Sequence, residues 1–596
     1  MSRVRSARDR FMMAIERHPV WLSFATAIVV TLPAIVAVGS NLFRHWYPTG
    51  DVSHTELMLR GIPRHPPLVG VAARVGNDIN NQGYTPGPSM AYVMYPVYLV
   101  FGRTSLGVLM STLSVHFAAI WASLHTIRRW AGDRTMLVLA IVIALMVRAL
   151  APRFFLEPWN VWIPVFAFLL FLVLAWGVVN GHTRALPIMC IVGTHCVQTH
   201  ISYVPLVVAL TIGVAAHALI KGARESKRQL GWSIALMILM WIPPVIEQLR
   251  PGSGNLRRLW EHFTDPPSDT VGLAAAIKAM AGELNLLGPW LRGPGRAPYD
   301  SPQWFGFALF VALVVAGIVA ARGQQRLRRA QIGLGGTTII GLIATARIFG
   351  NFYDYLIRWM WVLAVLWVAV SVAAIIGRSG VARVRRTVGA VGMALLVAVT
   401  TWGSVASARA YPPYRHDSDL VAGLAPQLDD ALPVNHSARL LRWHDPAALG
   451  GTAFGLVLEM EKRGVELGVD PWGGAAARPY RVLTEDRADS VLWLVVGPEN
   501  IERFAARADA IQIAYFDSRS PAEKAESDGL RVKIESSMRA AGHPEWIELL
   551  DSQYGHMQIL LFSPVSLDLF DLVARYSEIR LPAAVFAVPP GAPLYP

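Results

Sequence analysis

Long uncharged apolar runs recur along the first two thirds of this 596-residue chain. The first run, Trp21 to Phe43, holds about 23 residues without a charge, which is long enough to cross the roughly 30 Å hydrocarbon layer of a bilayer. Hydrophobic residues make up 54% of the chain and its mean hydropathy is +0.40, which is too apolar for an ordinary soluble protein. The sequence therefore predicts an α-helical polytopic membrane protein.

The apolar runs predict about eleven membrane spans. A shorter run at 88–101 begins with Pro86-Gly87-Pro88, so we expect a re-entrant or interfacial helix there. The predicted spans lie at 21–43, 104–127, 135–151, 160–180, 185–199, 204–220, 230–249, 303–321, 331–350, 356–377 and 387–408.

Basic residues gather in alternate connections between these runs. Pairs such as Arg128-Arg129 and Arg328-Arg329 lie in segments that share one side if the spans alternate, as does the basic N-terminal segment. Such clusters mark the cytoplasmic side of a plasma membrane, so the N-terminus is expected inside. The net charge of +13 therefore predicts no nucleic-acid partner, because orientation signals account for it.

Residues 409–596 differ from the membrane domain expected at 1–408. They hold 26 acidic and 18 basic residues, and an odd number of spans places them outside the cell. Short apolar runs predict strands at Ala438–Trp443, Val491–Val496, Ile511–Phe516 and Met557–Phe562, with helices at 452–463 and 521–541. This alternation predicts a C-terminal extracytoplasmic α/β domain. The two cysteines, Cys190 and Cys196, lie in an apolar run and are expected in the core.

With this topology, the polar motifs fall on the outer side of the membrane. The first outer loop is 44–103 and the long outer loop is 250–302. Ionisable side chains at helix ends that face one compartment can build a single polar cavity. The motifs are Gly50-Asp51 with His54 and Glu56, Pro67-Leu68-Val69-Gly70, Gly87-Pro88, Glu157-Pro158-Trp159-Asn160, Gln198-Thr199-His200 with Tyr203, and Asp354 with Arg358.

Each motif also has a structural interpretation. Asp51 is a helix-capping residue type, and Glu56 fits a surface charge on an interfacial helix. The histidines 195 and 200 fit hydrogen-bonded core groups better than metal ligands, because no acidic partner lies at metal spacing. Pro158 fits the first turn of a helix. Arg358, one turn inside a span, is either a snorkelling or an anion-binding side chain.

Together these motifs resemble the GT-C class of integral-membrane glycosyltransferases. The chain is similar to actinobacterial multi-span members with a Gly-Asp opening, a Pro-Leu-Val-Gly element, a Gly-Pro element, an acid-Pro-Trp-Asn loop and a Gln-Thr-His loop. The resemblance covers about residues 1–408. The first loop lacks the Asp-Asp or Asp-Glu pair of several GT-C families, and the chain lacks the Trp-Trp-Asp motif of oligosaccharyltransferases, which argues against protein N-glycosylation.

The resemblance implies sugar transfer from a polyprenyl-phosphate donor to a cell-envelope glycan or glycolipid, with arabinosyl or mannosyl transfer as examples. An inverting transfer needs one carboxylate to accept the proton of the attacking hydroxyl, and positive charge to offset the leaving phosphate. Asp51 is the expected base, with Glu56 as a second catalytic carboxylate. The expected substrate-binding residues are Arg358, His54 and His200 on the phosphate, Glu157 and Asn160 on the sugar, and Gln198 and Tyr203 beside them.

Two other functions remain open from the sequence. A lipid or small-molecule transporter would place polar groups along a path through the membrane. A non-catalytic scaffold of an envelope-assembly complex would keep the same shell without the chemistry. No cofactor is expected to be required; a divalent metal is compatible with this chemistry, but no residue cluster indicates one.

Overall fold

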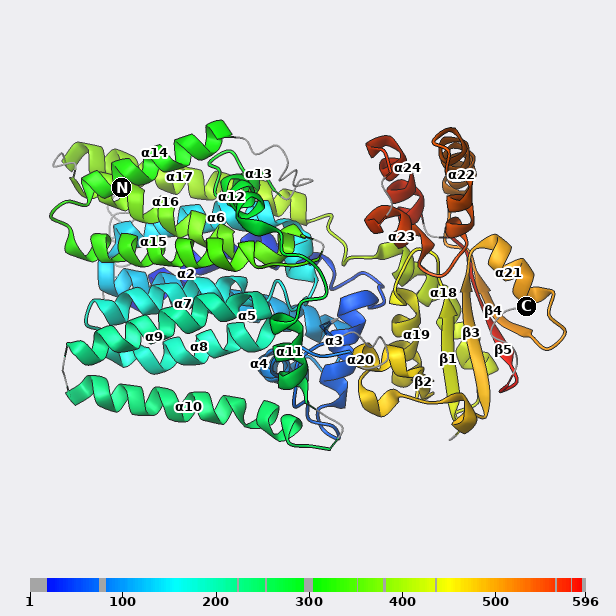
Figure 1. Ribbon diagram of the computed structural model, residues 1–596. Helices are drawn as coiled ribbons and strands as arrows, with labels where there is room; N and C mark the ends of the chain where they lie inside the picture. The colour runs from blue at the N-terminus through cyan, green and yellow to red at the C-terminus, as the bar shows by residue number, and fades with distance from the viewer. Residues whose placement is uncertain are drawn as a thin grey trace, which may run out of the picture. The chain divides into compact units, whose positions relative to one another are not determined.

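The chain forms two compact units in the computed structural model (Figure 1). The structure describes residues 19–73, 75, 82–221, 224–251, 254–293, 304–350, 352–378, 382–434, 437–562, 565–579 and 581–591, with 19, 382–388 and 562 as backbone only. The basic segment 1–18 and part of the predicted outer loop 250–302 lie outside these ranges. Unit 1 comprises Met1–Phe43, Pro67–Asn77 and Gly83–Tyr411, and unit 2 comprises Arg44–Pro66, Asp78–Gln82 and Pro412–Pro596.

Unit 1 is a bundle of long apolar helices, and each predicted span corresponds to a helix (Figure 1). By length and composition, seven helical segments of the described chain can cross a membrane: α2, α5, α6, η3 with α9, α10, α16 and α17. The α-helical polytopic class is thereby confirmed. The helices at the predicted spans are α2 (Pro19–Ser40), α5 (Ser105–Ala131), α6 (Asp133–Leu156), α7 (Pro164–Val179), α8 (Leu186–Thr199), α9 (Val204–Ile220), α10 (Arg224–Gln248), α14 (Trp304–Ala320), α15 (Gln325–Ala346), α16 (Trp359–Arg378) and α17 (Ala382–Ser407).

Shorter helices join these elements. The run at 88–101 forms a helix of only 12 residues, and the predicted long outer loop carries three more short helices. Both cysteines are buried and unbridged, as expected of core residues. The short elements are α4 (Ser89–Val100), α11 (Asn255–Thr264), α12 (Gly272–Glu283), α13 (Pro289–Arg292), η2 (Thr183–Ala185), η3 (Ile201–Tyr203) and η4 (Asp354–Ile357).

One end of unit 1, which we call the basic end, is formed by the α5–α6, α7–α8 and α14–α15 connections. Trp130 stacks on His182 at 4.4 Å between ring centroids. Arg326 donates from Nη1 to the Trp130 carbonyl at 2.9 Å, and Trp176 donates from Nε1 to the Arg326 carbonyl at 2.9 Å. Aromatic and basic side chains of this kind are typical of a membrane interface.

Unit 2 is built on a five-stranded sheet with strand order β2-β1-β3-β5-β4 (Figure 1). Strands β2, β1 and β3 are parallel, and β5 is antiparallel to both β3 and β4. Because both faces of the sheet are covered, β3 is an almost continuous apolar run with six buried residues. The strands are β1 (Arg439–His444), β2 (Leu467–Val469), β3 (Ser490–Val496), β4 (Ile511–Phe516) and β5 (Ala583–Val588).

Three of the four predicted strands are confirmed as β1, β3 and β4, and the helices predicted at 452–463 and 521–541 are α19 and α22. The strand predicted at Met557–Phe562 is wrong, because this run is the helix α23. The helices of unit 2 are α3 (Gly50–Gly61), α18 (Arg415–Ala431), α19 (Gly451–Lys462), α20 (Gly474–Ala477), α21 (Pro498–Ala505), α22 (Pro521–Ala540), α23 (Gly555–Phe562) and α24 (Leu567–Glu578), with the short η5 (Pro471–Gly473), η6 (Pro479–Arg481), η7 (Glu485–Arg487) and η8 (Pro544–Leu550).

The first polar segment after α2 folds with unit 2. Leu57 of α3 is fully buried in the same apolar cluster as Leu424 of α18 and Phe454 of α19. Segment 44–66 therefore shares a core with residues 412–596, although the sequence analysis assigned it to the membrane domain.

Candidate functional site

The candidate residues of unit 1 gather at the end of the bundle opposite the basic end, where α6 and α8 end and α7, α9 and α16 begin. We call the segments 157–163, 199–203 and 353–358 the polar end. Asn160 donates from Nδ2 to the Thr199 carbonyl at 3.3 Å. Trp159 lies edge-on to Tyr355 at 4.7 Å between ring centroids. These contacts join three segments that are far apart in the sequence.

Arg358 is the central cation of the polar end and is only 3% exposed. Its Nη2 donates to Asp354, and its guanidinium lies 4.2 Å from the Trp361 ring centroid and 5.6 Å from that of Trp162. We call Arg358, Trp162 and Trp361 the guanidinium clamp. The Nε and Nη1 atoms of Arg358 are buried and hydrogen-bond to none of the described residues. Two buried donors on a fixed cation are suited to an anionic oxygen ligand.

Glu157 supports the guanidinium clamp. It is 1% exposed, and its carboxylate accepts hydrogen bonds from Arg153 Nε at 2.9 Å, Arg153 Nη2 at 3.3 Å and Trp162 Nε1 at 3.2 Å. Glu157 was expected to bind a sugar hydroxyl. The contacts of its two oxygens instead suit it to hold Trp162 in place.

Glu283, at the end of α12, contacts the guanidinium clamp but belongs to none of the sequence motifs. It is 1% exposed and accepts a hydrogen bond from Trp361 Nε1. The sequence holds no motif that marks it, because it is a single glutamate at the end of a short helix. Glu157 and Glu283 therefore each hold one tryptophan of the guanidinium clamp.

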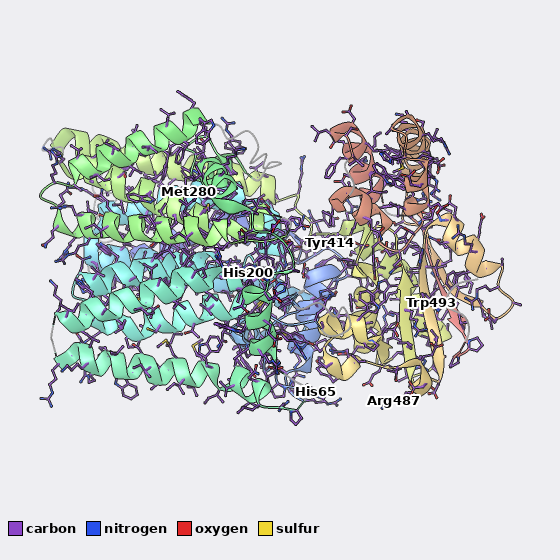
Figure 2. The ribbon with its side chains drawn as sticks, in the orientation of Figure 1. His65, His200, Met280, Tyr414, Arg487 and Trp493 are labelled. Carbon is purple, nitrogen blue, oxygen red and sulfur yellow. The ribbon has the colours of Figure 1, made fainter. Side chains whose placement is uncertain are left out.

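His200 lies at the polar end, directly after α8 (Figure 2). The Ser202 backbone N–H donates to its Nδ1 at 3.3 Å, and the Ser202 hydroxyl lies 2.7 Å from the same atom. A neutral imidazole that accepts at Nδ1 carries its proton on Nε2, which leaves Nε2–H as a donor. Tyr203, 2% exposed, packs edge-on against Phe168 at 5.2 Å.

Gln198 and two glycine motifs support the backbone beside this end. Gln198 donates from Nε2 of its side chain to the Met240 backbone carbonyl at 2.8 Å. The backbone carbonyl of Gln198 accepts from the Gly87 N–H at 3.2 Å. A Cβ on Gly87 would lie 2.4 Å from Gln198, and one on Gly70 would lie 1.8 Å from the Thr85 hydroxyl. The Pro-Leu-Val-Gly, Gly-Pro and Gln-Thr-His motifs are thus joined through close backbone packing.

Two further histidines lie buried inside the unit 1 bundle. His195 pairs through Nδ1 with the Ser89 hydroxyl at 3.1 Å, and its Nε2 has no hydrogen-bond partner among the described residues. His116 is fully buried beside Phe154 at 4.8 Å, and the described residues offer neither of its nitrogens a partner. The expectation of a satisfied core histidine thus holds for only one nitrogen of His195.

Asp51, His54 and Glu56 lie together on α3 in unit 2. Asp51 occupies the first turn, where the helix dipole favours a carboxylate, and its side chain is 39% exposed. It is not the N-cap residue, which is Thr49. His54 lies edge-on to Phe454 at 4.5 Å, with Nδ1 at 3.8 Å from Asp51 Oδ1. The carboxylate of Asp51 is therefore accessible to solvent.

Glu56 has a different environment from Asp51. It is fully buried, and the Lys462 ammonium of α19 lies 3.0 Å from its Oε1. Arg60, one turn further along α3, pairs with Glu461 at 3.0 Å. These two ion pairs attach α3 to α19, so the geometry gives Glu56 a structural task.

The aromatic residues of unit 2 belong mostly to its core. Trp443 is 5% exposed and Trp493 is 8% exposed, and Trp493 lies among the strands (Figure 2). Tyr480 is 37% exposed and stacks on His65 at 4.0 Å. No group of three or more His, Cys, Asp or Glu side chains in the described ranges is arranged to hold a metal ion.

Comparison with known proteins identifies the fold. No known family model matches the chain, and no curated protein matches its sequence. ArnT from Cupriavidus metallidurans bound to undecaprenyl phosphate is similar over 82% of this chain and 95% of that chain, with a TM-score of 0.50 and 13% identity. The oligosaccharyltransferase AglB from Archaeoglobus fulgidus is similar over 96% of this chain and 89% of that chain, with 11% identity and a TM-score of 0.45. The arabinofuranosyltransferase AftD from Mycobacteria is similar over 84% of this chain and 39% of that chain, with 15% identity and a TM-score of 0.35.

The likeness to ArnT shows that this chain has the fold of the GT-C membrane glycosyltransferases. With its apolar helices, the protein is a multi-pass membrane protein.

Proposed function

We propose that the protein is an inverting glycosyltransferase that uses a polyprenyl-phosphate sugar as donor. The observation that carries this proposal is Arg358, a buried arginine with two donors directed at none of the described residues. A lipid-linked donor brings its phosphate to the headgroup level of the membrane, where helices begin and end. The shared fold with ArnT, which was solved with undecaprenyl phosphate, supports the same donor class.

The proposed reaction needs a base for the acceptor hydroxyl and a cation for the leaving phosphate. An acceptor hydroxyl attacks the anomeric carbon, the bond from that carbon to the phosphate oxygen breaks, and polyprenyl phosphate leaves. Asp51 accepts the hydroxyl proton. Arg358 offsets the charge that develops on the leaving phosphate, with Nε2–H of His200 as an additional donor. His54 orients Asp51, and Asn160 contacts the sugar.

The acceptor in this proposal is a cell-envelope polysaccharide or glycolipid outside the membrane, with the N-terminus cytoplasmic and unit 2 extracytoplasmic. Arabinose and mannose are the candidate sugars, as in actinobacterial envelope glycans. The positions of the basic residues support this orientation, because Arg326, Arg329 and Arg184 lie at the end of unit 1 opposite the polar end.

Binding of polyprenyl phosphate tests the donor assignment separately from catalysis. Full-length protein in lipid nanodiscs is titrated with polyprenyl phosphate, and Arg358→Gln is compared with Arg347→Gln, which changes an exposed arginine at the end of α15. A hydrogen bond to a charged group contributes about 1.5–3 kcal/mol, so Arg358→Gln should weaken binding about 10- to 150-fold. Arg358→Lys, which keeps the charge, should fall between. Equal affinities for Arg358→Gln and Arg347→Gln would remove the basis of the proposal.

A further inference from the structure

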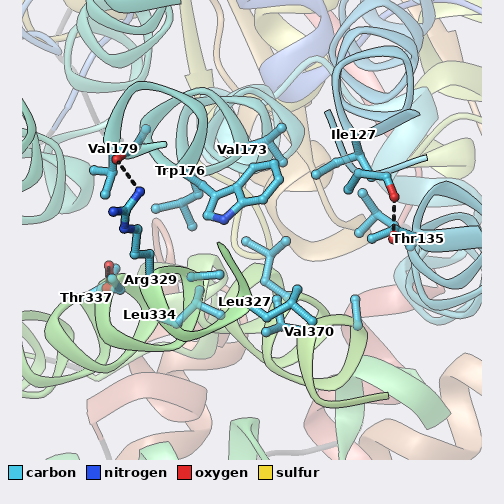
Figure 3. Close-up of a pocket in the computed structure, with 18 of the residues that line it drawn as sticks. Ile127, Thr135, Val173, Trp176, Val179, Leu327, Arg329, Leu334, Thr337 and Val370 are labelled. Atoms are coloured by element: carbon cyan, nitrogen blue, oxygen red, sulfur yellow. Dashed lines mark hydrogen bonds between the residues drawn. The ribbon is translucent and has the colours of Figure 1, made fainter. Parts of the chain in front are cut away.

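A second ligand site is suggested by an apolar cavity between the helices of unit 1, and none of the polar-end segments lines it (Figure 3). Its volume is about 110 Å³, and residues of α5, α6, α7, α9, α15 and α16 line it. The lining is almost wholly hydrocarbon, and it contains no acidic side chain. Representative lining residues are Ile127, Leu139, Val173, Trp176, Leu334 and Val370.

Open space lies beside a glycine of α15 that lines this cavity. Gly333 lines it, and a Cβ added there would meet no atom within 4 Å. Apolar cavities of this size in proteins stay dry and accept apolar ligands. The atoms that line an empty cavity also lose dispersion contacts, so hydrocarbon is the favoured filling.

Basic groups with spare donors border the cavity. Arg329 lines it and donates from Nη1 to the Val179 carbonyl at 3.4 Å (Figure 3). The same Nη1 atom also donates to Asn180 Oδ1 at 3.2 Å. Arg326, one helical turn earlier, is exposed and donates from Nη1 to the Trp130 carbonyl. A guanidinium has five N–H donors, so both arginines keep donors for a phosphate.

We propose that this cavity binds one acyl chain of an anionic phospholipid, whose phosphate is held by Arg326 and Arg329. A zwitterionic lipid offers the same hydrocarbon chain, but its own cation competes with the two arginines for the phosphate. Basic pockets between membrane helices are known to hold anionic headgroups. The bound chain fills the space between α7 and α15, beside the hydrogen bonds from Trp176 to Arg326 and from Arg329 to Val179 that join these helices directly. This site is independent of the proposed transfer reaction.

The test measures phospholipid retained by the full-length protein. Protein is reconstituted with phosphatidylglycerol and phosphatidylcholine, and bound lipid is counted by native mass spectrometry. Gly333→Leu fills the cavity, and Gly213→Leu is the matched control, because a Cβ at Gly213 of α9 also meets no atom within 4 Å but does not line the cavity. Gly333→Leu should lose at least tenfold of the retained phosphatidylglycerol, whereas Gly213→Leu should keep it.

The paired arginines test the headgroup assignment. Arg326→Gln/Arg329→Gln should bind the two lipids equally. Retention of phosphatidylglycerol by Gly333→Leu at the control level would overturn the proposal, as would a retained polyprenyl lipid in place of phospholipid.

A measurement that does not depend on Gly333→Leu covers the case in which that variant does not fold. The fluorescence of Trp176, obtained as wild type minus Trp176→Phe, should be quenched more by chain-brominated phosphatidylglycerol than by chain-brominated phosphatidylcholine. Equal quenching would also overturn the proposal.

Discussion

Changing Glu56 and Lys462 one at a time separates a structural carboxylate from a catalytic one. The pair is unequally buried, because Glu56 is fully buried and the Lys462 side chain is 20% exposed. Removing one partner of a buried ion pair costs about 3–5 kcal/mol when the other charge is left uncompensated. Lys462→Met keeps the buried carboxylate of Glu56 without this ammonium. Because water reaches the partly exposed site of Lys462, we expect the free energy of unfolding to fall by about 2–4 kcal/mol, a little less than for a fully buried pair.

Glu56→Gln should cost less than Lys462→Met. It leaves the partly exposed ammonium, which water can solvate and which already lies 4.0 Å from Glu459. The expected loss is about 1–2 kcal/mol. The double variant Glu56→Gln/Lys462→Met should recover part of the stability lost by Lys462→Met, because it also removes the buried negative charge.

Hydrogen exchange on the full-length protein measures these losses locally. Amides of α3 and α19 should exchange about 30- to 1000-fold faster in Lys462→Met and about 5- to 30-fold faster in Glu56→Gln, since about 1.4 kcal/mol corresponds to a factor of ten. Glu56→Gln should keep sugar transfer within about threefold of wild type. A variant with unchanged exchange and abolished transfer would refute the structural role of Glu56 and assign it to catalysis.

Three further predictions concern other buried contacts. Glu283→Leu removes the hydrogen-bond acceptor of Trp361 Nε1, so it should raise KM for the polyprenyl-phosphate donor more than it lowers kcat. Glu283→Gln, which keeps an acceptor, should restore KM. An unchanged KM in Glu283→Leu would contradict this role of Glu283. Gly87→Ala places a Cβ 2.4 Å from Gln198, and this clash should lower the stability of the protein by about 1–3 kcal/mol. The thermal midpoint of Gly87→Ala should be lower than that of Gly39→Ala, where a Cβ meets nothing within 4 Å. Equal midpoints of the two variants would disprove the clash. Burial lowers the pKa of His444, and its hydrogen bond to the Asp551 carbonyl only partly offsets this. The folded form therefore takes up this proton at a lower pH than the unfolded chain, so unit 2 should lose stability as the pH falls below about 6.5. A thermal midpoint that does not change between pH 5 and 7, or a pH dependence that His444→Phe leaves unaltered, would show that this residue does not titrate as described.

The membrane part of the fold was predictable because hydrocarbon thickness sets helix length. Every predicted span has a helix, and the prolines near the starts of α7, α8 and α9 agree with the preference of proline for a first turn. Span number is harder to obtain, because α8 has only 14 residues and α15 carries charges in its first turns.

The sheet of unit 2 was only partly predictable. The run at Met557–Phe562 is too short to distinguish a strand from a buried helix by periodicity, and it forms α23. The strand that lies between β3 and β4 is instead β5, the alanine- and valine-rich run Ala583–Val588, which was not predicted as a strand. The attachment of α3 to unit 2 depends on contacts about 400 residues apart in sequence, such as Arg60 with Glu461, so no local pattern contains it.

The candidate site followed from sequence only as a set of helix-end motifs. The position of Arg358 near the start of a predicted span identified it as a candidate. That its Nε and Nη1 atoms are buried without a partner among the described residues depends on how Trp162 and Trp361 enclose it, which the sequence does not show. Glu283 was missed, because a single glutamate at the end of a short helix carries no motif. Whether a carboxylate such as Glu56 is buried is likewise decided by its tertiary partner.

Transfer of labelled sugar by purified full-length protein tests the central claim most directly. The donors are polyprenyl-phosphate arabinose, mannose, glucose and galactose, offered with an envelope glycan acceptor, and Asp51→Asn is assayed beside wild type. Wild type should move label from one donor to the acceptor with inversion at the anomeric carbon, and Asp51→Asn should fold normally but react about 10²- to 10⁴-fold more slowly. If well-folded wild type consumes none of these donors, or if Asp51→Asn transfers sugar at the wild-type rate, the proposed mechanism is contradicted.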